Sequence, residues 1–224
     1  VVTEADRIQT EVAEARDRGI SCVVSDIAPA AFAIARQLDV PGIAVANFCW
    51  HWIYEPYAAR YKRYQWVIDH IREQEGMASC LLRLPFAWDF PCMPRAVDVP
   101  LIGRRAAIPR AEVRAALGFG ETERAALLSF GGFGLDALHD QHLNQWPDWL
   151  FITTDPSRPP GRRANTLNVT NQEISYVDLL AATDAVVTKP GFGIVSDALT
   201  NRVPVLYSDR GDFREYGDRK STRL

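Results

Sequence analysis

Short apolar runs alternate with amphipathic segments from the first residues of the chain onward. Residues 4–18 carry apolar side chains at helical spacing among charges, and the alanine-rich residues 30–39 predict a second helix. Residues 22–27 and 40–47 are short, apolar and partly β-branched. Strands of this kind are typical of a parallel sheet that is buried on both faces, so the pattern predicts a strand–helix–strand unit.

The next segment mixes aromatic and charged residues. Residues 50–75 predict a long helix that ends near Gly76, and we expect Pro56 to break its opening turn. Residues 80–84 predict another strand, whereas the proline-rich residues 86–100 predict irregular structure.

The same alternation restarts after a seam near residue 104, where a basic pair, a proline and a new helix follow one another. The predicted strands are 124–130, 149–154, 166–169, 184–189 and 203–208, the predicted helices are 136–146, 174–183 and 193–201, and residues 157–165 are an expected loop. We therefore expect an α/β protein with two Rossmann-like, doubly wound domains, residues 1–103 and 104–224. Both domains look truncated, because the chain opens on a helix without a preceding strand and stops soon after a strand.

Composition narrows the class of protein. Of the 224 residues, 47% are hydrophobic and 24% are charged, and the net charge is −3, which is typical of a globular protein and does not indicate nucleic-acid binding. No apolar run is long enough to span a bilayer. The four cysteines form no C-x-x-C pair, which favours reduced thiols in a cytoplasmic protein; they are Cys22, Cys49, Cys80 and Cys92.

Two glycine-rich turns carry the clearest chemical signal. LLSFGGFG (127–134) and VVTKPGFG (186–193) each end an apolar strand with glycines and lead into a helix. Glycine lets a ligand approach the backbone, and the free N–H groups at a helix start attract anions. Two such turns in one domain predict a diphosphate site, although each alone is also a common tight connection. Neither turn matches the dinucleotide or P-loop pattern, so NAD and ATP are not expected.

Three polar residues near the second turn fit the same site. Ser196 could offer a hydroxyl to a phosphate, and Asp197 could accept the hydroxyls of a ribose. The helix dipole alone would also favour Asp197 near a helix start. Lys189 could pair with a phosphate or remain solvated.

These residues resemble a known family. VDLLAATDAVVTKPGFGIVSDALTNRVPVLYSDRGDFREY is similar to the nucleotide-sugar half of GT-B glycosyltransferases, of the type that makes lipid II and glycolipids. SDIAPAAFAIARQLDVPGIAVANFCWHWIY, RLPFAWDFPCMPRAVDVPLIGRRA and LLSFGGFG look closer to the glycosyltransferase-like segment that is fused to some sugar kinases, such as plant arabinokinase. The resemblance covers nearly the whole chain.

The resemblance implies a metal-independent hexosyltransferase that uses a UDP-sugar as donor substrate and needs no cofactor. It places the diphosphate against Gly131, Gly132, Phe133, Gly191, Phe192, Gly193 and Ser196, the ribose at Asp197, the base at Tyr176 and Val177, and the sugar at Phe213, Arg214 and Glu215. Asp197 stands where the family usually has Glu, and Tyr216 stands where it often has Gln.

The catalytic base should come from the first domain, and His51 is the candidate in a plausible loop, against a packing role for the same residue. His139 and His142 have the spacing of metal ligands, but a solvated helix face explains them better, so no metal site is expected.

Other functions remain open. The acceptor is not identified, and an aromatic cluster suits an acceptor surface, peripheral membrane contact or core packing alike; its members are Trp50, Trp52, Tyr54, Tyr57, Tyr61, Tyr64 and Trp66. A non-catalytic nucleotide-sugar-binding module of a sugar kinase is the main alternative. A non-hydrolysing epimerase is a further one, but its set of acids and a histidine cannot be assembled from this sequence.

Overall fold

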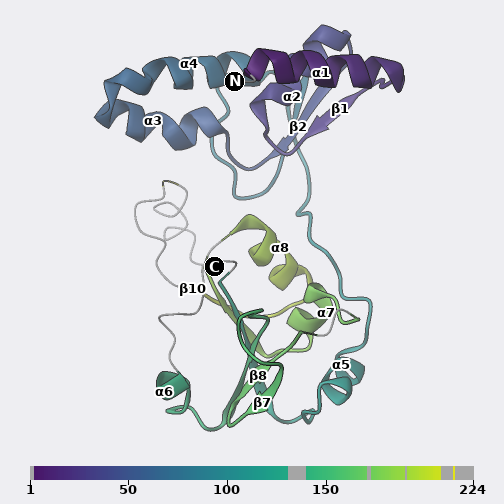
Figure 1. The fold of residues 1–224 in the computed structure, drawn as a ribbon, viewed down its shortest axis with the longest axis vertical. Helices are drawn as coiled ribbons and strands as arrows, with labels where there is room; N and C mark the ends of the chain where they lie inside the picture. Colours follow the sequence, from purple (N-terminus) through teal and green to yellow (C-terminus); the bar gives the residue numbers. More distant parts are fainter. Residues whose placement is uncertain (1–2, 131–139, 171–172, 190, 208–213, 215–224) are drawn as a thin grey trace. The chain divides into compact units, whose positions relative to one another are not determined.

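The structure is a computed structural model that describes residues 3–130, 140–170, 173–189, 191–207 and 214. The chain divides into two compact units (Figure 1). Unit 1 contains residues 1–101 together with Arg214, and unit 2 contains residues 102–212. Sequence analysis placed the boundary at 103/104 and did not foresee that Arg214 belongs to unit 1.

Unit 1 is built on a parallel sheet of four strands in the order β1-β2-β3-β4. Its elements are α1 (Glu4–Asp17), β1 (Val23–Ser25), α2 (Pro29–Leu38), β2 (Gly42–Ala46), α3 (Trp50–Arg60), the 3-10 turn η1 (Lys62–Tyr64), α4 (Gln65–Glu75), β3 (Cys80–Arg83) and β4 (Ala96–Asp98). The predicted strand–helix–strand unit is confirmed in β1, α2 and β2. Strand β4 was missed, because all three of its residues are exposed and show no apolar pattern.

Local chemistry explains where the first elements begin and how they pack. Thr3 caps α1 in a capping box with Asp6, which satisfies the first free N–H groups of the helix. Strand β2 passes very close to α2, since a Cβ atom on Gly42 would lie 3.0 Å from the Cβ atom of Ala35. Glycine at this position allows the close contact between helix and strand.

The helix predicted for residues 50–75 is interrupted, but not where we expected. Pro56 lies inside α3, and the break occurs after Arg60, at Tyr61. Proline has no N–H to donate to the carbonyl four residues earlier, which is that of Trp52. The guanidinium of Arg214 donates to this carbonyl instead and also pairs with the carboxylate of Glu55. The free carbonyl in α3 therefore has a partner, and the helix continues past the proline.

Unit 2 contains a sheet of six strands in the order β10-β9-β5-β6-β8-β7, parallel except for β7. Its elements are α5 (Arg110–Ala116), β5 (Arg124–Ser129), α6 (Asp140–Leu143), β6 (Trp149–Thr153), β7 (Gly161–Arg163), β8 (Thr166–Asn168), α7 (Tyr176–Ala181), β9 (Ala185–Thr188), α8 (Phe192–Thr200) and β10 (Val205–Tyr207). The predicted strands are confirmed, whereas β7 lies in the expected loop and is exposed along its length.

The order of strands reverses next to β5. The chain runs from β5 to β6 and β8 on one side, and then returns through α7 to β9 on the other side. Strands β5 and β9 are parallel neighbours, and Ser129 pairs with Thr188 at their carboxyl ends. In open α/β sheets, such a reversal creates a crevice at the carboxyl edge where ligands bind. None of the helices within the described residues is long and apolar enough to cross a membrane.

Candidate functional site

The carboxyl edge of unit 2 brings the starts of both glycine-rich turns together. Thr188 ends β9, and its hydroxyl donates to the carbonyl of Ser129 over 2.5 Å. The hydroxyl of Tyr176, in the first turn of α7, donates to Oγ of Ser129. Burial raises the pKa of Tyr176 above its usual value and keeps the phenol protonated. Tyr176 therefore lies at the same edge as the two turns, whereas the side chain of Val177 is buried.

The start of α8 is open to an anion. Gly191 is the N-cap and makes no side-chain cap, and the first turn of α8 has no acidic residue. Gly193 is exposed, and a Cβ atom on it would meet nothing within 4 Å. The first N–H groups of this nine-residue helix therefore face no capping side chain, and the positive end of the helix dipole lies here. Phe192 and Lys189 are half-buried on either side of Gly191.

Asp197 and Ser196 lie deeper in α8 than a ligand-facing role would suggest. Asp197 exposes 4% of its surface, and its carboxylate accepts from the backbone N–H of Arg104 over 2.8 Å. The guanidinium of Arg104 donates to the other carboxylate oxygen over 2.6 and 3.1 Å, while most of the Arg104 side chain stays exposed. Ser196 is also buried, and its Oγ has no hydrogen-bond partner among the described residues.

The contact between Arg104 and Asp197 is one of several hydrogen bonds that fix the seam segment, residues 102–108, onto α7 and α8. Oδ1 of Asn201 accepts from the N–H of Ala106, and Oδ1 of Asp178 accepts from the next two N–H groups over 2.6 and 2.9 Å. At Gly103, a Cβ atom would lie 2.2 Å from Oγ1 of Thr200, so only glycine fits this close to α8. Sequence analysis missed this role of the carboxylates, because no pattern links residues so far apart.

Other predicted site residues lie in unit 1, on α6 or outside the described residues. Arg214 lies in unit 1, where its guanidinium is held by Trp52 and Glu55 and sits 4.4 Å from the ring centre of Trp52. The expected sugar contact of Arg214 stays a prediction. The residues Gly131, Gly132, Phe133, His139, Phe213 and Glu215 lie outside the described residues, and His142 is exposed on α6.

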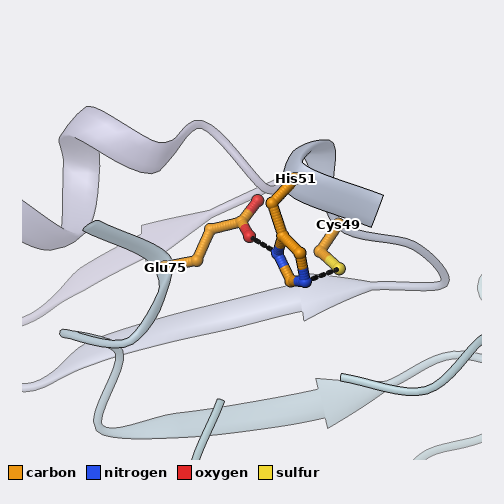
Figure 2. Close-up of side chains that lie close together, drawn as sticks. All are labelled: Cys49, His51 and Glu75. Atoms are coloured by element: carbon orange, nitrogen blue, oxygen red, sulfur yellow. Dashed lines mark hydrogen bonds and ion pairs between the residues drawn. The ribbon is translucent and has the colours of Figure 1, made fainter. Parts of the chain in front are cut away.

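His51 belongs to a buried cluster in unit 1 (Figure 2). Its Nδ1 pairs with the carboxylate of Glu75, and its Nε2 lies 3.8 Å from Sγ of Cys49. Burial lowers the pKa of His51, but its contacts with Cys49, Cys92 and Glu75 outweigh this effect and raise the pKa to about 11. His51 exposes only 3% of its surface, and both ring nitrogens face buried partners. This geometry does not suit a base that must reach an acceptor hydroxyl.

The aromatic cluster divides in two. The rings of Trp52 and Trp88 stack, with their centres 4.4 Å apart. Other members are exposed, namely Tyr54, Tyr57, Tyr61, Tyr64 and Trp66. A role for the exposed rings in acceptor or membrane contact stays a prediction.

A concave region of about 490 Å³ lies at the other end of the unit 2 strands, lined by Glu123, Trp149 and Arg162 among others. Trp149 begins β6, so this hollow lies at the amino edge of the sheet. Ligands of open α/β sheets bind at the carboxyl edge, which makes this hollow a poor candidate site.

Comparisons with known proteins agree with this architecture. No protein-family model matches the chain. The chain is 31% identical over 217 residues to L-arabinokinase from Arabidopsis thaliana, across 96% of this chain and 21% of the kinase. Among solved structures, a glycotransferase of kitacinnamycin covers 96% of this chain and 64% of its own, with a TM-score of 0.64 and 16% identity.

Two further structures repeat the match. Glycosyltransferase SnogD from Streptomyces nogalater is 19% identical, with a TM-score of 0.60 over 96% of this chain and 62% of its own. Spinosyn rhamnosyltransferase SpnG, complexed with thymidine diphosphate, is 15% identical, with a TM-score of 0.60 over 97% of this chain and 62% of its own. The chain thus spans about a fifth of the kinase and less than two thirds of each of these structures. It has the α/β fold of the GT-B glycosyltransferases, and its sequence is similar to a segment of plant L-arabinokinase.

Proposed function

We propose that the protein is a glycosyltransferase that moves a sugar from a nucleoside diphosphate to an acceptor hydroxyl. The observation that carries the proposal is the reversal of strand order between β5 and β9, where a glycine turn opens the uncapped helix α8. An anion held there meets backbone N–H groups and the positive end of a helix dipole. SpnG, which has a similar fold, was solved with thymidine diphosphate, a ligand of this class.

In the proposed reaction, the acceptor oxygen attacks the anomeric carbon, and the bond from that carbon to the diphosphate breaks. The negative charge that develops on the leaving diphosphate would be stabilised by N–H groups of Gly191, Phe192 and Gly193, with Lys189 and Ser196 nearby. The turn at 131–133 would hold the other side. Such stabilisation needs no divalent metal. The acceptor proton passes to a base that we do not assign to His51.

For the nucleobase of the donor substrate, Tyr176 offers a protonated phenol ring at the carboxyl edge of the unit 2 sheet. We propose a uridine nucleotide, as the resemblance implies, with hexose as the transferred sugar. The acceptor alcohol is not specified by any side chain described above.

Binding of the diphosphate can be tested by calorimetric titration of the chain with UDP, dTDP, GDP and inorganic phosphate. We expect UDP to bind best and phosphate alone to bind weakly. The change Gly193→Asp adds a negative charge at the start of α8, where no atom obstructs it. We expect it to weaken UDP binding about tenfold through charge repulsion.

The matched control is Gly120→Asp, since a Cβ atom there also meets nothing within 4 Å and Gly120 lies just before β5, away from the carboxyl edge. This control should bind UDP like the wild type. Failure of every nucleotide to bind the wild type, or equal loss in both variants, would refute the proposed site.

The role of Asp197 has its own test, because Arg104 already holds its carboxylate. If Asp197 binds ribose, Asp197→Asn should weaken UDP binding about tenfold while Arg104→Gln leaves it unchanged or tighter. If Asp197 only anchors the seam segment, both variants should lower thermal stability and leave affinity unchanged. Calorimetry and a melting curve on each variant separate the two roles.

A binding module without catalysis is the second candidate. It is consistent with the arabinokinase match, in which this chain corresponds to 21% of that kinase. Release of UDP from a UDP-hexose, measured with and without acceptor alcohols, distinguishes the two. A chain that binds UDP but never releases it from the donor would be a binding module.

A further inference from the structure

Four side chains with metal-binding atoms meet inside unit 1, and Figure 2 shows three of them. Cys49 is the N-cap of α3, and His51 lies in the first turn of that helix. Glu75 is the last residue of α4, and Cys92 lies in the irregular segment between β3 and β4. Cys49 and Glu75 have no exposed surface, and His51 is nearly as buried. The cluster therefore joins three separate segments of the unit.

We propose that Cys49, His51, Glu75 and Cys92 bind a divalent cation of the zinc class in a structural site. The cation takes the position of the proton between Nδ1 of His51 and Oε2 of Glu75, and both sulfurs bind as thiolates. Binding releases the two thiol protons and the Nδ1 proton to solvent, as metal binding by such ligands does. Nothing in the proposed transfer reaction uses this site.

The distances support this assignment. Zinc bonds of about 2.3 Å to sulfur and about 2.1 Å to nitrogen or oxygen place neighbouring tetrahedral ligands about 3.5 Å apart. Sγ of Cys92 lies 3.5 Å from Nδ1 of His51 and 3.8 Å from Oε2 of Glu75. One ligand atom each from Cys49, His51 and Glu75 lies within 4.8 Å of the other two. Sγ of Cys49 lies 3.8 Å from Nε2 of His51, so this thiol has to move toward the Nδ1 side of the ring, and the carboxylate moves outward as the metal replaces the shared proton.

The residue types also favour a metal over a network of hydrogen bonds. Thiols are weak hydrogen-bond donors and acceptors, whereas thiolates are strong ligands of zinc-class cations. Two sulfurs and one imidazole match three of the four ligands of a Cys2His2 structural zinc site, and a carboxylate oxygen also binds zinc. The other carboxylate oxygen of Glu75 accepts from the backbone N–H of Trp50 over 2.8 Å. This bond orients the carboxylate as an outer partner of a metal ligand does.

The start of α3 offsets the charge of the occupied site. Two thiolates and a carboxylate around a divalent cation leave one net negative charge in the interior. Cys49 makes no side-chain cap, and the first turn of α3 has no acidic residue. The positive end of the helix dipole therefore lies next to Cys49 and offsets part of this negative charge.

Metal content of the purified chain tests the proposal directly. We expect about one equivalent of zinc by mass spectrometry of the elements after purification in reducing buffer without chelators. The chain stripped of metal should take up zinc again in competition with a coloured chelator. It should also melt several degrees lower than the loaded chain. Cobalt should give the absorption bands of tetrahedral thiolate coordination.

Cys49→Ser and Cys92→Ser should each reduce zinc uptake by at least tenfold. Cys22→Ser and Cys80→Ser are matched controls, because these thiols lie outside the cluster, and both should keep the metal. Less than a tenth of an equivalent in the wild type together with no zinc uptake would overturn the proposal. Equal uptake by all four variants would overturn it as well. The wild-type measurements decide the question even if Cys49→Ser does not fold.

Discussion

At the scale of single residues, Arg114 shows how unit 2 uses a buried charge. Its guanidinium is 1% exposed and donates to the carbonyls of Gly120, Ala182 and Glu123. It also lies 4.7 Å from the ring centre of Phe119. Three carbonyls from two segments, the α5–β5 connection and the end of α7, are satisfied by one side chain, so Arg114 supplies hydrogen bonds that the sheet and helices cannot.

Replacing this arginine should destabilise the unit strongly. Arg114→Ala leaves three carbonyls without their donor, one of them buried at Ala182, and opens a cavity, so we expect the free energy of unfolding to fall by about 3 kcal/mol. Urea denaturation followed by circular dichroism measures this loss. Arg162→Ala removes an exposed pair with Glu123 and should cost less than about 1 kcal/mol. Comparable losses in the two variants would contradict the role given to Arg114.

At the scale of elements, the seam segment is fixed to α7 through a single carboxylate. Asp178 lies in the first turn of α7 and binds two consecutive N–H groups of the segment. Burial would raise the pKa of Asp178, but hydrogen bonds from Ile108, Ser175 and Ala107 outweigh it and hold the pKa below its usual value. The charged carboxylate is therefore the form that stabilises the fold.

The sign of the pH effect follows from this lowered pKa. The stabilisation is fully present above about pH 4, the unfolded pKa of an aspartate, and is lost as the pH falls through the lower folded value. Asp178→Asn should lower the free energy of unfolding at pH 7 by about 2 kcal/mol and flatten its fall in acid. Denaturation at a series of pH values measures both. Asp148→Asn changes an exposed carboxylate and should alter neither the stability at pH 7 nor its dependence on pH. If the stability of Asp178→Asn falls in acid as steeply as that of the wild type, this account is contradicted.

At the scale of the whole chain, the alternating pattern was enough to predict both parallel sheets. Strands such as β5 and β9 are buried, and buried strands need apolar residues, so they show a hydrophobic pattern in the sequence. The exposed strands β4 and β7 carry no such pattern and were missed. The pairing of β5 with β9 could not be predicted from the sequence and came from the structure.

Long-range polar contacts could not be predicted. The partners Glu75 and His51, or Asp197 and Arg104, lie far apart in sequence, and charged residues at each position look like ordinary surface residues. The prediction that Pro56 breaks its helix was wrong. The effect of a proline depends on whether the carbonyl four residues earlier finds another donor, and the local sequence does not show this. That donor, Arg214, follows all of unit 2 in the sequence.

The contact between Arg214 and the Trp52 carbonyl spans 162 positions, and all of unit 2 lies between its two partners. Because unit 2 is synthesised between these two partners, α3 receives its missing donor only after all of unit 2 has been made. Docking of Arg214 onto α3 therefore closes a long loop, at an entropic cost that a unit formed from one continuous segment would not meet.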